Sequence, residues 1–332
     1  MRTGQNPAKS IKHVAQPEQV TVAVVTYIPF LSGYYTESLD VLKVCLESLW
    51  RNTDMPYDLV VFDNASCSEV RDYLMQAHAN DRIQYLLLSE RNIGKGGAWN
   101  FVFGGAPGEY IAYSDGDIYF YPGWLSEQVG VLETLPNVGM VTGIPMWSPE
   151  EFSTSTIKWA QENPDADLEL GGLLSWEDYW KHARSLGHTR EKAREHYSTC
   201  QEYRFEYQGQ KYFIGAGHFQ FMARRRVIQS VLPIPSQRPM GQVRQLDIAL
   251  NDKGYLRLST QDWWVQHIGN TLSTEFLESN ADRITQPQFE TKKQLLQNYA
   301  VPKNKSGFWR LPPVRKFLQW THGKSFEILY RN

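Results

Sequence analysis

Residues 110–120, YIAYSDGDIYF, place a run of apolar and small side chains directly before two acids that a glycine separates. The run predicts a buried strand, and Asp115 and Asp117 then lie where that strand ends. An Asp-Gly pair is common in exposed turns, which is the plainer interpretation. Two carboxylates one residue apart can also share a hard metal ion that holds phosphate oxygens. The neighbouring segments decide between these interpretations.

The segments before this strand alternate between apolar runs and amphipathic stretches. Strands are predicted over 20–27, 57–64, 82–88 and 109–115, and helices follow each of the first three. This order predicts an α/β fold with a mainly parallel sheet flanked by helices. In such sheets ligands bind where the strands' carboxyl ends open. Asp63, at the end of the second strand, and Asp115 are therefore expected at one edge.

The alternation stops after residue 145. Residues 146–202 are polar and rich in tryptophan, and they predict a helical insertion. Residues 203–300 begin with a hairpin around Gly209 and continue as strand, helix and strand, which predicts the second half of the same sheet domain. Residues 1–19 are polar and predict a flexible N-terminus. Residues 20–145 then form the first half of the domain.

Composition limits the classes of protein to consider. The 332 residues carry a net charge of -2, which argues against a general nucleic-acid binder. The three cysteines are isolated and fit a reduced compartment better than a disulfide framework. No signal-peptide core or membrane-spanning stretch is evident, so a cytoplasmic location is expected.

The final segment, 301–332, differs from the rest in charge. It carries seven Lys or Arg residues and one acid, with aromatic residues between them. An arm folded onto the body of the protein is the favoured interpretation. Contact with the inner face of an anionic membrane is the second.

A glycine-rich segment, ERNIGKGGAWN (90–100), lies between the third strand and the fourth. A helix that starts with glycines lets a phosphate or ribose approach its backbone donors. A plain loop and helix start is the other interpretation. The known fingerprints for dinucleotides and for the triphosphate loop, G-x-G-x-x-G after the first strand and G-x-x-x-x-G-K-[ST], are both absent.

Four segments in order resemble glycosyltransferase family 2, whose members have the GT-A (Rossmann-like) fold. They are Thr26-Tyr27 at the end of the first strand, FDNAS around Asp63, NIGKGGAWN from Asn92, and DGD followed by YPGWL. Later segments resemble the family more loosely: GAGHFQFMARRRVI, RQLDIALNDKGYLRL and VQHIGN. One departure is Gln245-Leu246-Asp247, where the family usually has an acidic pair.

The resemblance implies a nucleotide-sugar site in residues 20–145 and an acceptor side in residues 203–300. Asp117 is the expected metal ligand, with Asp115 on ribose, metal or metal-bound water, and His267 as a third ligand. The metal would be Mn²⁺ or Mg²⁺. Both His267 and Asp115 have plainer interpretations, as a packed histidine and a turn residue.

The family's donor contacts map onto six residues. Asp63 would accept a hydrogen bond from the ring N–H of uracil, which favours a UDP-sugar. The remaining contacts are expected from Thr26 and Tyr27 to the base, and from Asn92, Gly94 and Lys95 to the ribose or phosphates. Lys95 can instead be a solvated residue at a helix start.

An inverting transfer needs one carboxylate to deprotonate the acceptor hydroxyl. Asp247 is the candidate base, and a helix N-cap is its other interpretation. The predicted function is sugar transfer from a nucleotide-sugar to a hydroxyl of a glycan, a lipid-linked saccharide or a peptide. The alternatives are a non-catalytic nucleotide- or carbohydrate-binding protein and a sugar-phosphate nucleotidyltransferase. The second is disfavoured because YIPFLSGYY after the first strand has no basic residue.

Overall fold

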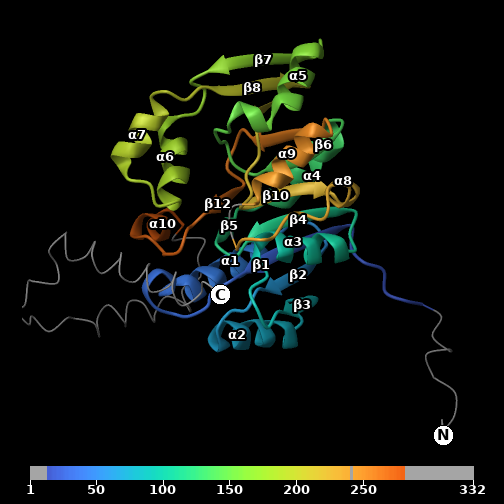
Figure 1. The fold of residues 1–332 in the computed structure, drawn as a ribbon, viewed down its shortest axis with the longest axis vertical. Coiled ribbons are helices and arrows are strands. Elements are labelled where there is room, and N and C mark those ends of the chain that lie inside the picture. The colour runs from blue at the N-terminus through green and yellow to red at the C-terminus, as the bar shows by residue number, and fades with distance from the viewer. Residues whose placement is uncertain (1–12, 240–241, 281–332) are drawn as a thin grey trace, which may run out of the picture. The chain divides into compact units, whose positions relative to one another are not determined.

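The computed structural model describes residues 13–239 and 242–280 (Figure 1). The arm expected at 301–332 and most of the expected N-terminal segment lie outside these residues. The strands are β1 Val20–Thr26, β2 Tyr57–Asp63, β3 Tyr85–Leu88, β4 Tyr110–Asp115, β5 Ile118–Phe120, β6 Val138–Thr142, β7 Ala166–Gly171, β8 Glu202–Tyr207, β9 Gln210–Ile214, β10 Gln220–Arg224, β11 Leu256–Thr260 and β12 Val265–His267.

The helices alternate with the strands in the first half and cluster in the insertion. They are η2 Gly33–Tyr35, α1 Ser38–Asn52, α2 Ser68–Ala79, α3 Gly94–Gly105, α4 Trp124–Thr134, η3 Glu150–Phe152, α5 Thr154–Glu162, α6 Trp176–Ser185, α7 Arg190–Tyr197, α8 Arg225–Gln229, α9 Arg244–Asp252 and α10 Thr274–Ser279. Among the described residues, no helix has the length and apolar character that crossing a bilayer requires.

Ten strands form one sheet in the order β3-β2-β1-β4-β10-β6-β11-β9-β8-β7. The first four are parallel, as the alternating sequence predicts. The sheet is mixed beyond β4, where β10 pairs antiparallel with both β4 and β6. Seven of the ten strands run in one direction, and the exceptions are β7, β9 and β10. The α/β fold expected from the sequence is confirmed.

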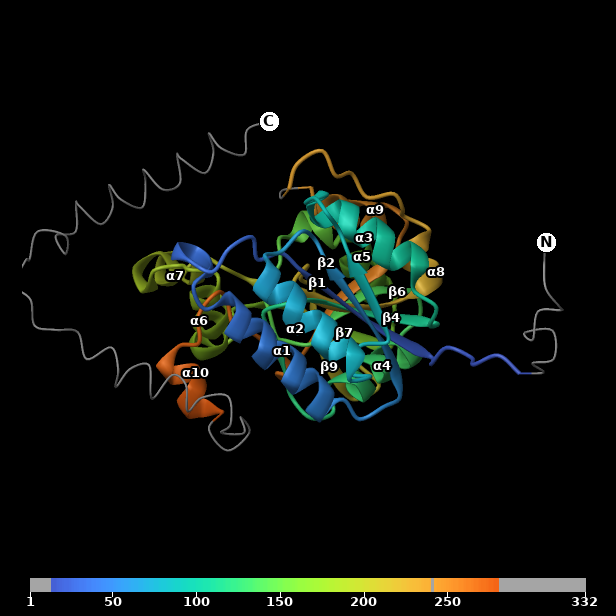
Figure 2. The ribbon, with the colours of Figure 1, turned by 90° about the horizontal axis from the view of Figure 1, so that it is seen from below.

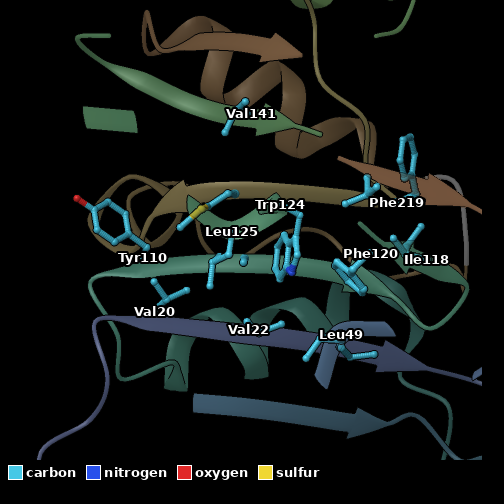
Figure 3. Packing of buried hydrophobic residues seen from close by; sticks show 14 of the residues in the cluster. Val20, Val22, Leu49, Tyr110, Ile118, Phe120, Trp124, Leu125, Val141 and Phe219 are labelled. Atoms are coloured by element: carbon cyan, nitrogen blue, oxygen red, sulfur yellow. The ribbon is translucent and has the colours of Figure 1, made fainter. Parts of the chain in front are cut away.

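Both faces of the sheet are covered, because residues along β1 alternate between two apolar layers. Val22 and Val24 pack toward α1, α2 and α4, whereas Ala23 and Val25 pack toward α3, α8 and α9 (Figure 2). Figure 3 shows the first layer around Trp124, which is fully buried. Burial on both faces explains why β1 is continuously apolar in sequence.

Residues 146–202 contain more than the helices expected there. Besides η3, α5, α6 and α7 they contain β7, which pairs antiparallel with β8 and extends the sheet to its far edge. The alternation in β7 is weak, since its residues are half-buried or exposed, and an edge strand of this kind gives little hydrophobic signal. Helices α6 and α7 pack against each other around Trp176 and Ala183.

Candidate active site

Polar side chains gather where β1, β2 and β4 end. The strand register pairs Thr26 with Asp63 and Val25 with Asp115. The ends of these three parallel strands therefore lie in a row at one edge of the sheet, where open α/β sheets bind ligands.

Asp117 lies in the turn from β4 to β5, and a second, two-stranded sheet of β5 and β12 holds it beside His267. The backbone N–H of Ile268 donates to the Asp117 carbonyl at 2.8 Å. His267 pairs with Ile118 across the two strands, and its Nε2 is 3.3 Å from Asp117 Oδ2. The other carboxylate oxygen, Oδ1, is buried with no hydrogen-bond partner among the described residues. Asp117 thus has one free oxygen next to an imidazole.

Asp115 is engaged differently from Asp117. Its Oδ2 is 2.6 Å from Lys95 Nζ, and its Oδ1 accepts a hydrogen bond from the Tyr113 hydroxyl. Burial raises the pKa of Asp115 more than Lys95 lowers it. Burial also acts to raise the pKa of Asp117, but the charge and hydrogen bond of His267, together with the charge of Lys95, hold that pKa below its usual range. Of the two acids, Asp117 is the one held ionised.

His267 is fixed from its other side by the insertion. Ser185, the last residue of α6, lies with its Oγ 2.9 Å from His267 Nδ1 and donates to the His182 carbonyl at 2.7 Å. Since the Ser185 proton is used, Nδ1 is the donor in this contact, and Nε2 is left to face Asp117. Burial acts to lower the pKa of His267, but the charge and hydrogen bond of Asp117, together with the charge of Asp115, raise it above its usual value.

Asp115, Asp117 and His267 are brought close together, but not as a finished metal site. Within the part of the chain that the structure describes, no three His, Cys, Asp or Glu side chains can hold a metal ion by themselves. The expected set of three protein ligands is therefore not formed, because Asp115 is turned to Lys95 and Tyr113.

The glycine-rich start of α3 packs against another part of the chain. The N–H groups of Lys95 and Gly97 donate to the Pro239 carbonyl at 3.2 Å and to Ser236 Oγ at 2.8 Å. A Cβ on Gly96 would lie 2.6 Å from the Pro235 carbonyl oxygen. The glycines therefore allow residues 235–239 to approach, and the expected use of these backbone donors for a phosphate is not what this conformation shows.

Asn92 and Gly94, two predicted donor contacts, hold the loop before α3. Asn92 Oδ1 accepts from the N–H of Gly94 at 2.8 Å and from Asn64 Nδ2 at 3.0 Å. Gly94 has a φ of +76°, a conformation that favours glycine. Asn92 and Gly94 therefore lie beside the strand ends, because Asn64, which donates to Asn92, directly follows β2.

Asp63 is enclosed at the end of β2. Its side chain is 0% exposed and accepts hydrogen bonds from Ser66 N and from Arg71 Nε, both at 3.1 Å. A contact from Asp63 to a nucleobase stays a prediction, and in this conformation its carboxylate already has protein donors. Thr26 is buried beside it, and Tyr27 is half-buried in an edge contact with Tyr35 of the long first loop.

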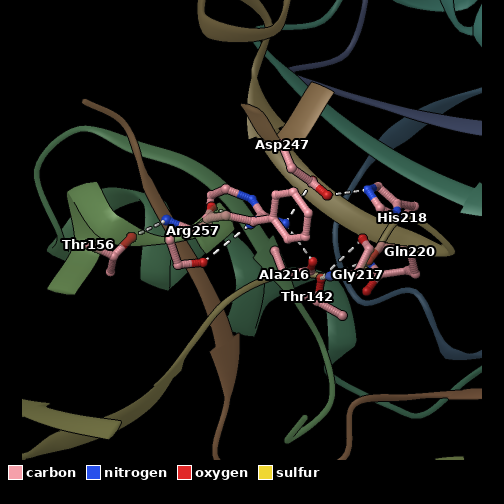
Figure 4. A network of polar contacts seen from close by, with 10 residues as sticks. Thr142, Thr156, Ala216, Gly217, His218, Gln220, Asp247 and Arg257 are labelled. Carbon is pink, nitrogen blue, oxygen red and sulfur yellow. Dashed lines mark hydrogen bonds and ion pairs between the residues drawn. The ribbon is translucent and has the colours of Figure 1, made fainter. Parts of the chain in front are cut away.

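Asp247 belongs to a buried polar network with Arg257 and His218 (Figure 4). It lies in the first turn of α9 but is not the N-cap, which is Val243. Its Oδ1 is 2.7 Å from Nη2 of Arg257 on β11, and its Oδ2 contacts His218 Nε2. The capping interpretation is therefore wrong, and the catalytic one stays a prediction.

Three residues of this region were missed in the sequence. Arg257 had a readable signal, since a charge inside the apolar strand YLRLST must find a buried partner. Ser185 and His218 had none, because their partners lie 82 and 29 residues away in the chain.

The chain is similar in sequence to known proteins. Residues 33–227 match the family described as glycosyl transferase family 2. An uncharacterized glycosyltransferase of Nostoc sp. is 31% identical over 102 residues, which cover 30% of this chain and 31% of that protein. One of Methanocaldococcus jannaschii is 26% identical over 108 residues, 32% of this chain and 37% of that protein. The chain thus matches about a third of the length of these relatives.

Two solved structures are similar at lower sequence identity. The mannosyltransferase PcManGT of Pyrobaculum calidifontis, in complex with GDP-Man and Mn²⁺, has a TM-score of 0.46 at 15% identity, with 95% of this chain and 81% of that chain covered. S. aureus TarS has a TM-score of 0.43 at 13% identity, with 74% and 59% covered. Since the family match spans more than half of the chain, the protein belongs to glycosyl transferase family 2.

Proposed function

We propose that the protein transfers a sugar from a nucleotide-sugar to an acceptor hydroxyl, with a divalent cation bound at Asp117. The observation that carries this proposal is the buried Oδ1 of Asp117, which has no hydrogen-bond partner in the described part of the chain and lies beside the Nε2 of His267 at the ends of the parallel strands. A buried carboxylate oxygen without a partner is costly, and a bound cation removes that cost.

The donor set fits a hard or borderline cation. Asp117 offers carboxylate oxygen and His267 offers an imidazole nitrogen, which together suit Mn²⁺ and, less well, Mg²⁺. Bound there, the cation would neutralise the charge that develops on the departing diphosphate. Two protein ligands would leave the remaining coordination positions to the phosphates of the donor and to water.

Lys95 supplies a second positive charge next to the proposed cation. Its side chain is only 14% exposed, and Asp115 holds its ammonium group. A fixed ammonium beside the strand ends stabilises a leaving diphosphate without reorganising during the reaction. Asp115 then acts as the group that positions Lys95, and a hydrogen bond from Asp115 to the ribose is the alternative role.

The donor and acceptor classes rest on the family resemblance. UDP is the favoured nucleotide, inversion the favoured stereochemistry, and a glycan, lipid-linked saccharide or peptide hydroxyl the acceptor. Membership of a glycosyl transferase family removes the nucleotidyltransferase alternative. A protein that binds nucleotide-sugars without transferring them would keep the same residues, so turnover must be measured.

The test is a melting-temperature screen of the purified protein against UDP-glucose, UDP-galactose, UDP-N-acetylglucosamine and GDP-mannose, each with Mn²⁺, with Mg²⁺ and with EDTA. A ligand at about 100 times its Kd stabilises the native state by about 2.7 kcal/mol, which is a shift of several degrees. We expect a shift for a UDP-sugar that disappears in EDTA, and release of UDP on incubation. Shifts from none of the four donors would contradict the proposal.

A further inference from the structure

Asp247 is in the wrong environment to meet an acceptor hydroxyl directly. Its side chain is 3% exposed, and both carboxylate oxygens have protein partners. One partner, Arg257, is 1% exposed and is itself fixed by hydrogen bonds to the carbonyls of Phe152 at 2.6 Å and Ala216 at 2.8 Å. Removing Asp247 from this arrangement would leave a buried guanidinium without its counter-ion, which is strongly unfavourable.

The other partner of Asp247 is accessible. His218 is 23% exposed, and it contacts Asp247 through Nε2. An ionised carboxylate can only accept a hydrogen bond, so Nε2 carries the hydrogen and Nδ1 carries a lone pair. Among residues 13–239 and 242–280, Nδ1 has no hydrogen-bond partner. Arg257, Asp247 and His218 thus form a line from the interior to a free imidazole nitrogen (Figure 4).

His218 lies next to the proposed donor site. The carbonyl of Phe219, the following residue, accepts from the N–H of Asp115 at 2.7 Å. The ring of His218 is 6.3 Å from that of Trp99, and Lys95 Nζ lies 5.3 Å from the same indole. His218 therefore lies close to the Lys95–Asp115 pair, two residues before β10 begins.

We propose that His218, held by Asp247, is the catalytic residue that takes the proton from the acceptor hydroxyl; this rests on the proposed function. The acceptor oxygen forms its bond to the anomeric carbon while its proton moves to His218 Nδ1. The bond from that carbon to the diphosphate oxygen breaks, and the electron pair leaves with the nucleoside diphosphate. Asp247 then stabilises the imidazolium, and Arg257 positions Asp247. The oriented imidazole follows the general logic of a base held by a carboxylate.

The test measures UDP release from UDP-glucose with Mn²⁺ and with water as the acceptor, so that no acceptor need be known. If the thermal screen selects another of its four donors, that donor replaces UDP-glucose and its nucleoside diphosphate is measured. We expect H218A and D247N each to lose about 10²–10⁴-fold of the release rate. Their combination should lose little more, because the two residues act as one unit. The donor-dependent melting shift should be unchanged in all three variants.

Two further measurements separate proton transfer from a structural role. Added imidazole should restore part of the rate of H218A, because the truncated side chain leaves room for a free base, and it should not restore D117A. The matched control is H188A, an exposed histidine of the insertion, which should release UDP at the wild-type rate.

The outcomes distinguish this inference from the proposed function. If H218A keeps the release rate within about twofold, or if only D247N loses it, His218 is not the base and the inference fails alone. A wild-type protein that shows no donor-dependent shift overturns the proposed function. Donor binding without any release of nucleoside diphosphate by the wild type overturns both.

Discussion

Two acidic centres use the same pair of side-chain types, an aspartate and a histidine, in opposite ways. The Asp117 centre consists of Asp117, His267 and Ser185, and the Asp247 centre of Asp247, His218 and Arg257. Asp117 is 32% exposed and keeps one free oxygen. Asp247 is 3% exposed and has Arg257 at 2.7 Å. The first centre leaves one carboxylate oxygen without a partner among the described residues, whereas the second already contains a positive charge in Arg257.

Their unequal exposure determines which carboxylate can exchange its partner. A carboxylate with partial exposure can be solvated while a ligand enters or leaves, so binding is reversible at modest cost. A buried carboxylate that loses its counter-ion remains an uncompensated charge. The Asp117 centre is therefore suited to binding, and the Asp247 centre to holding a neighbouring group in place.

The largest expected effect concerns the Asp247 centre. Arg257→Met should reduce the free energy of unfolding by about 3–5 kcal/mol, because it leaves Asp247 buried beside an apolar side chain. Urea unfolding followed by circular dichroism measures this. Combining it with Asp247→Leu should recover most of the loss, since the unpaired charge is then removed.

The matched variant in the Asp117 centre is His267→Gln. We expect it to reduce the free energy of unfolding by less than about 1 kcal/mol, because Asp117 is partly exposed. Equal losses for Arg257→Met and His267→Gln would show that the two centres do not differ in the way their burial indicates.

The second largest expected effect concerns the Asp117 centre. Asp117→Ala should lower the rate of nucleoside diphosphate release by about 10²–10³-fold and remove the metal-dependent part of the melting shift, because the proposed cation loses its carboxylate ligand. The melting temperature without ligands should stay close to that of the wild type. Asp165→Ala, in an exposed turn before β7, is the control. Normal turnover in Asp117→Ala would rule out the metal assignment.

The fold was predictable because its signal is local. Each strand of the parallel half is an apolar run, and each helix repeats its apolar residues at helical spacing, so β1 to β4 and α1 to α3 follow from short windows of sequence. The same windows place Asp63 and Asp115 at strand ends. β7 was missed because an edge strand with half-exposed residues lacks that periodicity.

The candidate active site was only partly predictable because its contacts are distant in sequence. The resemblance brought His267 to Asp117, but Ser185 and His218 gain their meaning only when separate segments meet. The glycines at 94, 96 and 97 show a further limit. Close approach of a phosphate and close approach of residues 235–239 demand the same absence of side chains, so the sequence alone cannot separate them.

The smallest expected effect concerns His182, whose ring centroid lies 6.2 Å from that of His267 in the Asp117 centre. Its Nδ1 is buried with no hydrogen-bond partner among the described residues. Burial, and after it the neighbouring charges of His267 and His188, lower the pKa of His182 to about 3. Beside Asp117 the imidazole of His267 can therefore carry a charge, whereas that of His182 stays neutral.

The sign of the pH dependence follows from this lowered pKa. The unfolded chain protonates His182 near its ordinary value of 6.5, whereas the folded protein leaves it neutral down to about 3. Acidification below about pH 6.5 therefore favours the unfolded state. Between about pH 7.5 and about pH 5, the wild type should lose about 2 kcal/mol more stability than His182→Gln, which has no proton to gain. Urea unfolding in EDTA at both pH values measures the difference, and parallel losses in the two proteins would show that the folded protein protonates His182 as readily as the unfolded chain does.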